Sequence, residues 1–191
     1  MIKINLIEYF ENTVKKCAGK IAVWDKDRNI TFLELEKYTK SLACKIVRDK
    51  GIIKKPVAVF LPKSIESVYV DLAIIYSGNF YMNLDVKTPA GRIGNILELV
   101  KPAAVITNNQ YEKNIREILP KGVALINLDA VDWGTEVYDE KVLSERLSTL
   151  IDTDPLCIIN TSGSTGTPKG VVLNHRSFFD FTEWAQEEFG F

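Results

Sequence analysis

Apolar positions along the chain follow two alternating patterns. Short β-rich runs, which are typical of buried strands, alternate with longer segments whose apolar residues recur at helical spacing. Leu6, Phe10 and Val14, for example, predict an amphipathic helix near the start of the chain. Because strands that alternate with helices indicate βαβ units, the pattern predicts an α/β fold with a layered, mainly parallel sheet flanked by helices.

The individual elements follow from the same patterns and from the residues at their ends. Strands are predicted at residues 57–61, 80–84, 103–107, 123–127, 156–160 and 171–173, and a hairpin at 21–31. Further helices are predicted at residues 32–50, 65–75, 89–100, 111–119 and 142–150, and one starting near 177. Thr31 and Glu34 match a capping box, and Thr88 is the predicted N-cap before Pro89.

Composition and charge exclude several classes of protein. The length of 191 residues suits one domain or slightly more. The chain has 24 basic and 25 acidic residues, a net charge of −1, and no basic stripe. This charge distribution argues against nucleic-acid binding. The apolar runs are too short to cross a membrane, and the first residues lack a signal-peptide core. Cys17, Cys44 and Cys157 are too scattered for a disulfide framework or a zinc site, so we expect a reducing cytoplasm, with Cys44 and Cys157 buried.

The chemistry of the chain is concentrated in residues 161–170, Thr-Ser-Gly-Ser-Thr-Gly-Thr-Pro-Lys-Gly, between two β-rich runs. Glycines let backbone N–H groups turn toward a ligand, and successive amides form an anion-binding nest. Hydroxyl groups and one lysine add donors for phosphate oxygens. The segment therefore predicts a polyphosphate site made of Thr161, Ser162, Gly163, Ser164, Thr165, Gly166 and Lys169.

Other interpretations of this segment fit less well. The common P-loop needs glycine immediately before its lysine, whereas Pro168 precedes Lys169 here, and the dinucleotide fingerprint GxGxxG is absent. A flexible Ser/Gly linker would not lie between two apolar β-rich runs. His175, the single histidine, follows the second run and is expected to have a structural role. Asp85 is expected to turn or cap the chain rather than bind a metal.

These residues resemble the adenylate-forming (AMP-binding) ligases, which include acyl-CoA synthetases and nonribosomal peptide synthetase adenylation domains. Residues 161–170 match the family's phosphate-loop signature, T-S-G-[ST]-T-G-x-P-K-G, at every defined position. Residues 30–35 and 76–93 resemble two further signatures, L-[TS]-Y-x-E-L and K-A-G-x-A-Y-V-P-I-D…P…R-I. The second departs from the family pattern at Asn79, Phe80, Asn83 and Gly91.

The resemblance implies an ATP- and Mg²⁺-dependent ligase that activates a carboxylate, favouring an amino acid, as an acyl-adenylate. The acyl group then passes to a carrier-protein or coenzyme A thiol. By matching position, the polyphosphate-site residues would hold the β- and γ-phosphates; no residue is assigned a catalytic or metal-binding role. Neither nucleic acid nor a membrane is an expected partner.

The chain lacks the family's later signatures for adenine, ribose and the catalytic lysine. We therefore expect residues 1–191 to be a truncated N-terminal part of an AMP-binding (adenylation) domain, without its C-terminal subdomains and inactive alone. The alternative is a short, non-catalytic module that binds a nucleotide, phosphate or a partner. The aromatic residues Phe178, Phe179, Phe181 and Trp184 fit a helical core face. If their packing partner is missing, this face predicts self-association.

Overall fold

The computed structural model describes residues 4–133, 138–162 and 168–190. Its main sheet has the strand order β6-β5-β3-β4-β7-β8, and β1 and β2 form a separate antiparallel hairpin. The strands are β1 (Ile21–Asp25), β2 (Arg28–Thr31), β3 (Pro56–Val59), β4 (Phe80–Asn83), β5 (Ala104–Thr107), β6 (Ala124–Asn127), β7 (Pro155–Ser162) and β8 (Pro168–Asn174). Strands β3 to β7 pair in parallel, and β8 pairs antiparallel with β7. The predicted α/β fold with a mainly parallel sheet is confirmed.

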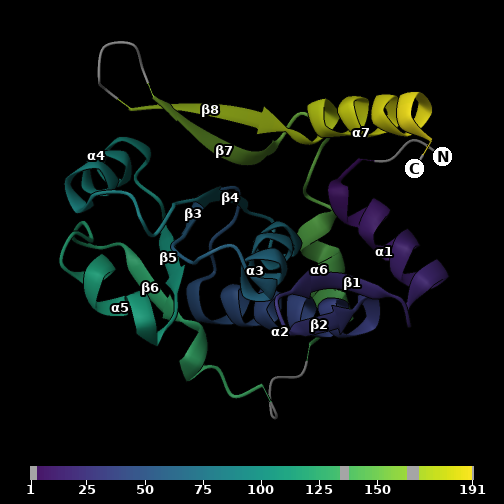
Figure 1. Ribbon diagram of the computed structural model, residues 1–191, viewed down its shortest axis with the longest axis horizontal. Coiled ribbons are helices and arrows are strands. Elements are labelled where there is room, and N and C mark those ends of the chain that lie inside the picture. Colours follow the sequence, from purple (N-terminus) through teal and green to yellow (C-terminus); the bar gives the residue numbers. More distant parts are fainter. Residues whose placement is uncertain (1–3, 134–137, 163–167, 191) are drawn as a thin grey trace.

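Helices cover both faces of the sheet (Figure 1). They are α1 (Leu6–Cys17), α2 (Phe32–Lys50), α3 (Ile65–Tyr76), α4 (Ala90–Val100), α5 (Asn109–Arg116), α6 (Glu140–Leu147) and α7 (His175–Phe189), with a 3₁₀ turn at Leu128–Ala130. The β7–β8 hairpin extends away from the body above α4, and α7 returns the chain to α1 at the other end (Figure 1). The hairpin that carries the predicted polyphosphate site therefore forms the edge of the sheet and projects beyond the rest of it.

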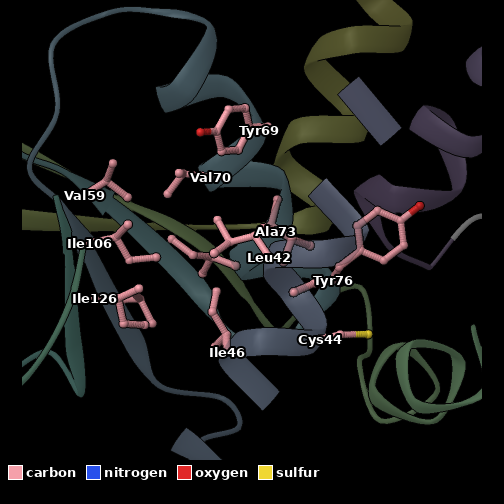
Figure 2. Packing of buried hydrophobic residues seen from close by; sticks show 14 of the residues in the cluster. Leu42, Cys44, Ile46, Val59, Tyr69, Val70, Ala73, Tyr76, Ile106 and Ile126 are labelled. Carbon is pink, nitrogen blue, oxygen red and sulfur yellow. The ribbon is translucent and has the colours of Figure 1, made fainter. Parts of the chain in front are cut away.

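Alternating side chains of the strands supply two separate cores. On one face, Val59 and Ile106 pack with Leu42 of α2 and Val70 of α3 (Figure 2). On the other face, neighbouring residues such as Ala58 belong to a cluster that includes the inner sides of α4 and α5. This strict alternation follows from the two-residue period of a strand, and it explains why the strand sequences are apolar throughout.

Local signals between neighbouring residues set both ends of helix α2. In the predicted capping box, the Glu34 backbone N–H donates to Thr31 Oγ1 (3.2 Å), and the Thr31 backbone N–H donates to Glu34 Oε2 (2.8 Å). Helix α2 ends at Lys50, before Gly51, whose φ of 61° suits glycine. Together these signals set both ends of the longest helix.

Other boundaries differ from the prediction. Thr88 is not the N-cap of α4: its backbone N–H closes a turn on the Asp85 carbonyl (2.9 Å), and the extended Pro89 is the cap, without a side-chain hydrogen bond. Helix α6 starts at Glu140 because the Asp139 carboxylate caps it. Strand β7 continues past residue 160 to Ser162 because β8 pairs with it along its length.

None of the helices within residues 4–133, 138–162 and 168–190 combines the length and apolar character that crossing a membrane requires. The longest described helix, α2, carries charged residues along its length.

Candidate functional site

The β7–β8 hairpin brings the two ends of the predicted polyphosphate site together. Thr161 pairs with Lys169 in the strand register, and Ser162 pairs with Pro168. The Thr161 hydroxyl donates to the Lys169 carbonyl (3.4 Å), and both residues are exposed. Gly163, Ser164, Thr165 and Gly166 lie outside the described residues. A hydroxyl and an ammonium group thus flank the position where the predicted loop begins and ends.

Gly170 leaves little room for a side chain in this hairpin. A Cβ at this position would lie 3.0 Å from Ile158 Cγ2 and 3.9 Å from Asn160 Oδ1, so the Ile158 side chain would have to shift by a few tenths of an ångström to admit it. Gly170 stands opposite Asn160 in the register.

A crevice opens beside the hairpin, next to helix α4. Strand β4 pairs in parallel with β7, with Tyr81 opposite Cys157. The crevice has a volume of about 400 Å³. It is lined by Tyr81, Asn83, Leu84, Asp85, Thr88, Arg92, Ile93, Ile96, Cys157, Ile158, Ile159 and Asn160. The crevice lies at the carboxyl ends of β4 and β7, where open α/β sheets bind ligands.

One wall of the crevice is supported by a partly buried carboxyl group. Asn83 Nδ2 donates to Asp71 Oδ2 (2.8 Å), while Asp71 Oδ1 is shielded from solvent and has no hydrogen-bond partner in the described structure. Burial raises the pKa of Asp71 to about 7, and the Asn83 amide opposes this shift. Burial also raises the pKa of the neighbouring Cys157 thiol. Cys157 is therefore a packing residue of the crevice wall rather than a reactive thiolate.

Asn79 and Asn83, two of the residues that depart from the family's second signature, have structural roles. The Asn79 side chain is 2% exposed; its Nδ2 donates to the carbonyls of Ile52 and Ser77, and its Oδ1 accepts the Lys55 backbone N–H (3.1 Å). These bonds tie the α3–β4 turn to the start of β3. Asn83 instead positions the Asp71 carboxyl group. Both departures thus maintain the sheet around the crevice.

The structural role expected of His175 is confirmed. Its side chain is fully buried, and Nδ1 accepts the Leu6 backbone N–H (3.2 Å), which joins α7 to α1. Burial lowers the pKa of His175 to about 4, so the ring is neutral at pH 7. Asp85 also behaves as expected, because its Oδ1 accepts the Lys87 backbone N–H (2.9 Å) in a turn.

Sequence patterns alone did not reveal the crevice residues Arg92 and Asn160, or the carboxyl group of Asp71 that accepts from Asn83. Arg92 was noted only as part of a signature, and Asn160 only as the end of a predicted strand. Among the described residues, no group of three or more His, Cys, Asp or Glu side chains could hold a metal ion. The arrangement of the described residues is suited to binding anions, with donors from Thr161, Lys169 and Arg92.

The fold and the hairpin define a class of protein: an α/β fold in which a strand of a mainly parallel sheet leads into a glycine-rich segment of the sequence. Comparison with known families then identifies the family, since the model of the AMP-binding enzyme family matches residues 10–191. The chain belongs to the AMP-binding enzyme family. The resemblance seen in the phosphate-loop signature is thereby confirmed.

Relatives within the family are nonribosomal peptide synthetases. The chain is 32% identical over 188 residues to a dimodular nonribosomal peptide synthase of Bacillus subtilis (strain 168), covering 97% of this chain and 8% of that protein. It is 31% identical over 185 residues to gramicidin S synthase 2 of Brevibacillus brevis, covering 96% of this chain and 4% of that protein. The chain thus spans less than a tenth of the length of these relatives.

A solved structure confirms the fold. The nonribosomal peptide synthetase FmoA3, in a form bound to α-methyl-L-serine-AMP, superposes with a TM-score of 0.81 at 22% sequence identity. The match covers 98% of this chain and 20% of that chain. The arrangement of strands and helices described above is therefore the arrangement found in an adenylate-forming enzyme.

Proposed function

We propose that residues 1–191 form the N-terminal part of an adenylation domain, in a protein that activates a carboxylate with ATP. The proposed product is an acyl-adenylate, from which the acyl group passes to a carrier-protein or coenzyme A thiol. The observation that carries this proposal is the hairpin pairing of Thr161 with Lys169 at the two ends of a complete phosphate-loop signature. Membership of the AMP-binding enzyme family supports it.

The residues of the hairpin suit the charges of this reaction. A substrate carboxylate oxygen would bond to the α-phosphorus of ATP, the bond from that phosphorus to the bridging oxygen would break, and pyrophosphate would leave. Negative charge grows on the departing pyrophosphate, so fixed donors near it lower the barrier. Lys169 and Thr161 would supply an ammonium group and a hydroxyl for those oxygens.

An amino acid is the proposed carboxylate. FmoA3, whose fold this chain shares, is described in a form bound to an amino-acyl adenylate, α-methyl-L-serine-AMP. The relatives at 31% and 32% identity are named as peptide synthases. The proposed compartment is the cytoplasm, because all three cysteines are free thiols.

Binding of MgATP to the purified chain tests the role of the hairpin. We expect Lys169→Gln to weaken binding about tenfold, since a charge-assisted hydrogen bond is lost. Lys121→Gln, which removes the same charge from an exposed site elsewhere, should leave binding unchanged. Isothermal titration calorimetry measures both. Measurable binding with equal affinities for the wild type and Lys169→Gln would contradict the proposed role of the hairpin, whereas no binding of MgATP would favour an incomplete domain over a binding module.

A second assay separates an incomplete enzyme from a non-catalytic binding module. The chain alone is expected to show no ATP–pyrophosphate exchange with a mixture of amino acids, because the family's later signatures for adenine, ribose and the catalytic lysine do not occur in it. Exchange above background would show that residues 1–191 are sufficient for adenylation. Tight, Lys169-dependent ATP binding without exchange would favour the binding module, and weak or absent binding without exchange would favour the incomplete enzyme.

A further inference from the structure

A second cavity lies at the carboxyl ends of β3, β5 and β6, on the part of the sheet remote from the hairpin. Strands β3 and β5 are neighbours, but the chain leaves β3 for α3 on one face of the sheet and leaves β5 for α5 on the other. Open α/β sheets bind ligands where the connections of adjacent strands diverge in this way. The cavity at this point has a volume of about 670 Å³, and its lining includes Glu66 of α3 and Asn108, just after β5.

Three aromatic side chains, Tyr38, Tyr69 and Trp133, line this space, which we call the aromatic cavity. The two tyrosine rings stack with their centroids 5.5 Å apart, and each meets the Trp133 ring edge-on, at 5.4 and 5.6 Å. Neither phenol hydroxyl has a hydrogen-bond partner in the described parts of the chain, and neither oxygen is shielded from solvent. The aromatic residues thus offer apolar surface for an alkyl chain and two free hydroxyl oxygens that can accept hydrogen bonds.

The charged groups around the aromatic cavity are mainly acidic. Three carboxylates and one guanidinium group belong to its described lining. The guanidinium group of Arg28 is already bound by Glu66 (2.9 Å) and by Asp25 (3.2 Å). The other two carboxylates, those of Asp27 and Asp129, are exposed and have no cationic partner among the residues that the structure describes. The cavity therefore carries an uncompensated negative charge.

This negative charge acts on the aromatic residues themselves. Burial raises the pKa of the Tyr69 hydroxyl, and the charges of Glu66 and Asp129 raise it further because they repel a phenolate. Carboxylates that disfavour an anion at this point favour a cation. An ammonium or guanidinium group would donate hydrogen bonds to the carboxylate and phenol oxygens, and aromatic rings attract organic cations.

We propose that the aromatic cavity binds a small organic cation, an ammonium or guanidinium group on a short alkyl stem. The stem would lie against the aromatic side chains, and the cationic group would lie near Asp27 and Asp129. The described lining of this cavity shares no residue with the crevice beside the hairpin or with the phosphate-loop signature. The inference therefore does not depend on the proposed function.

NMR of the tryptophan indole groups tests this proposal on the whole chain. The chain has three tryptophans, so the indole N–H resonance of Trp133 can be assigned by its loss in Trp133→Phe. The wild type is titrated at constant ionic strength with n-butylammonium and n-butylguanidinium, and with 1-butanol and butyrate as neutral and anionic ligands of the same stem. We expect a saturable shift of the Trp133 resonance with at least one cation, with an affinity about tenfold higher than for butanol or butyrate. Trp184 on α7 is an exposed internal control and should shift little.

Two conservative variants test the carboxylates. Asp27→Asn and Asp129→Asn each remove one charge and retain a side-chain oxygen, which at Asp129 accepts the Asn109 backbone N–H (2.8 Å). Each variant should weaken cation binding about threefold, as expected for a partly exposed charge pair. Asp180→Asn removes the same charge from an exposed position on α7 and should change nothing. Urea midpoints show whether the variants stay folded; Asp27→Asn alters an exposed turn residue and keeps the test valid if Asp129→Asn is unstable.

Several results would overturn the proposal. Equal affinities for the cations and butanol would show that the cavity recognises only an apolar stem. Equal shifts of Trp133 and Trp184 would show non-specific binding to exposed rings. The proposal also falls if neither cation gives a saturable shift, or if cation binding is unchanged in both aspartate variants. A higher affinity for one of the two cations would identify the preferred cationic group.

Discussion

In the body of the sheet, strands β3 and β5 have helices on both faces, and their apolar side chains from Val57 to Val59 and from Ala104 to Ile106 are at most 1% exposed. In the β7–β8 hairpin, by contrast, Ile159 and Val172 are 49% and 55% exposed. Strands β3 and β5 gain stability because their side chains are packed on both faces, whereas the hairpin is packed on part of its surface and leaves the rest exposed to solvent. Thr161 and Lys169, the residues proposed to bind phosphate, are therefore found on the exposed hairpin.

Core substitutions should reveal this difference most strongly. Leu42 of α2 is fully buried at the centre of the cluster in Figure 2. Leu42→Ala is expected to lower the free energy of unfolding by about 3 to 5 kcal/mol, through lost burial and the cavity left behind. Ile159→Ala in the hairpin should cost less than about 1 kcal/mol, because half of that side chain is already in water. Urea unfolding of both variants makes the comparison, and similar losses would contradict it.

Two buried titratable groups extend the comparison to pH. The pKa of Asp71 is raised from 3.8 to about 7 on folding, so the unfolding free energy falls as pH rises through this window. The pKa of His175 is lowered from 6.5 to about 4, so its contribution to the unfolding free energy rises with pH over nearly the same window. The two effects oppose each other, and the wild-type chain is expected to show a shallow pH dependence between pH 4 and 7.

Replacing the carboxyl group should separate these effects. Asp71→Asn keeps an oxygen that can accept the Asn83 amide but cannot ionise. We expect it to stabilise the chain by about 2 to 4 kcal/mol at pH 8, where the wild-type carboxylate is charged and poorly solvated. At pH 4 the carboxyl group is protonated in the folded state, so the gain should nearly vanish. Urea unfolding at both pH values tests this, and an equal gain at pH 4 and pH 8 would refute it.

Local sequence signals were sufficient for most of the fold. The capping box of Thr31 and the glycine after α2 depend only on neighbouring residues, and both were predicted correctly. Thr88 was misassigned because the turn to Asp85, rather than residue type, decides which residue caps α4. The length of β7 was underestimated because its last residues are held in a strand by pairing with β8.

The candidate site was predictable only where its residues are consecutive. Thr161 and Lys169 belong to one motif, and the hairpin pairs them as that motif suggests. Arg92 of α4 and Asn160 of β7 line the same crevice. No spacing along the chain indicates that they share it, so tertiary structure was needed to find the crevice.

Helix α7 has both a buried and an exposed set of aromatic side chains. Phe179 is buried and packs against Tyr9 of α1, with ring centroids 5.1 Å apart. On the same helix, Phe181 and Trp184 are 61% and 51% exposed and contact each other, with Trp184 also contacting the exposed Phe189. The predicted core face thus holds for Phe179 and for the partly buried Phe178, whereas Phe181 and Trp184 show the exposure predicted for a face that lacks its packing partner. Clustered exposed aromatic rings favour association between molecules.

Self-association through this helix should be separable from folding. Phe181→Ser combined with Trp184→Ser is expected to reduce the apparent mass of the chain in light scattering at high concentration, with a change in unfolding free energy of less than about 1 kcal/mol. Gln186→Ser, on an exposed position of the same helix, controls for a general effect of serine on α7. Because Phe179 and His175 hold α7 against α1 in either variant, the helix should remain docked. A wild-type chain that is monomeric at high concentration, or a double variant with unchanged mass, would show that the exposed rings do not mediate contact between copies.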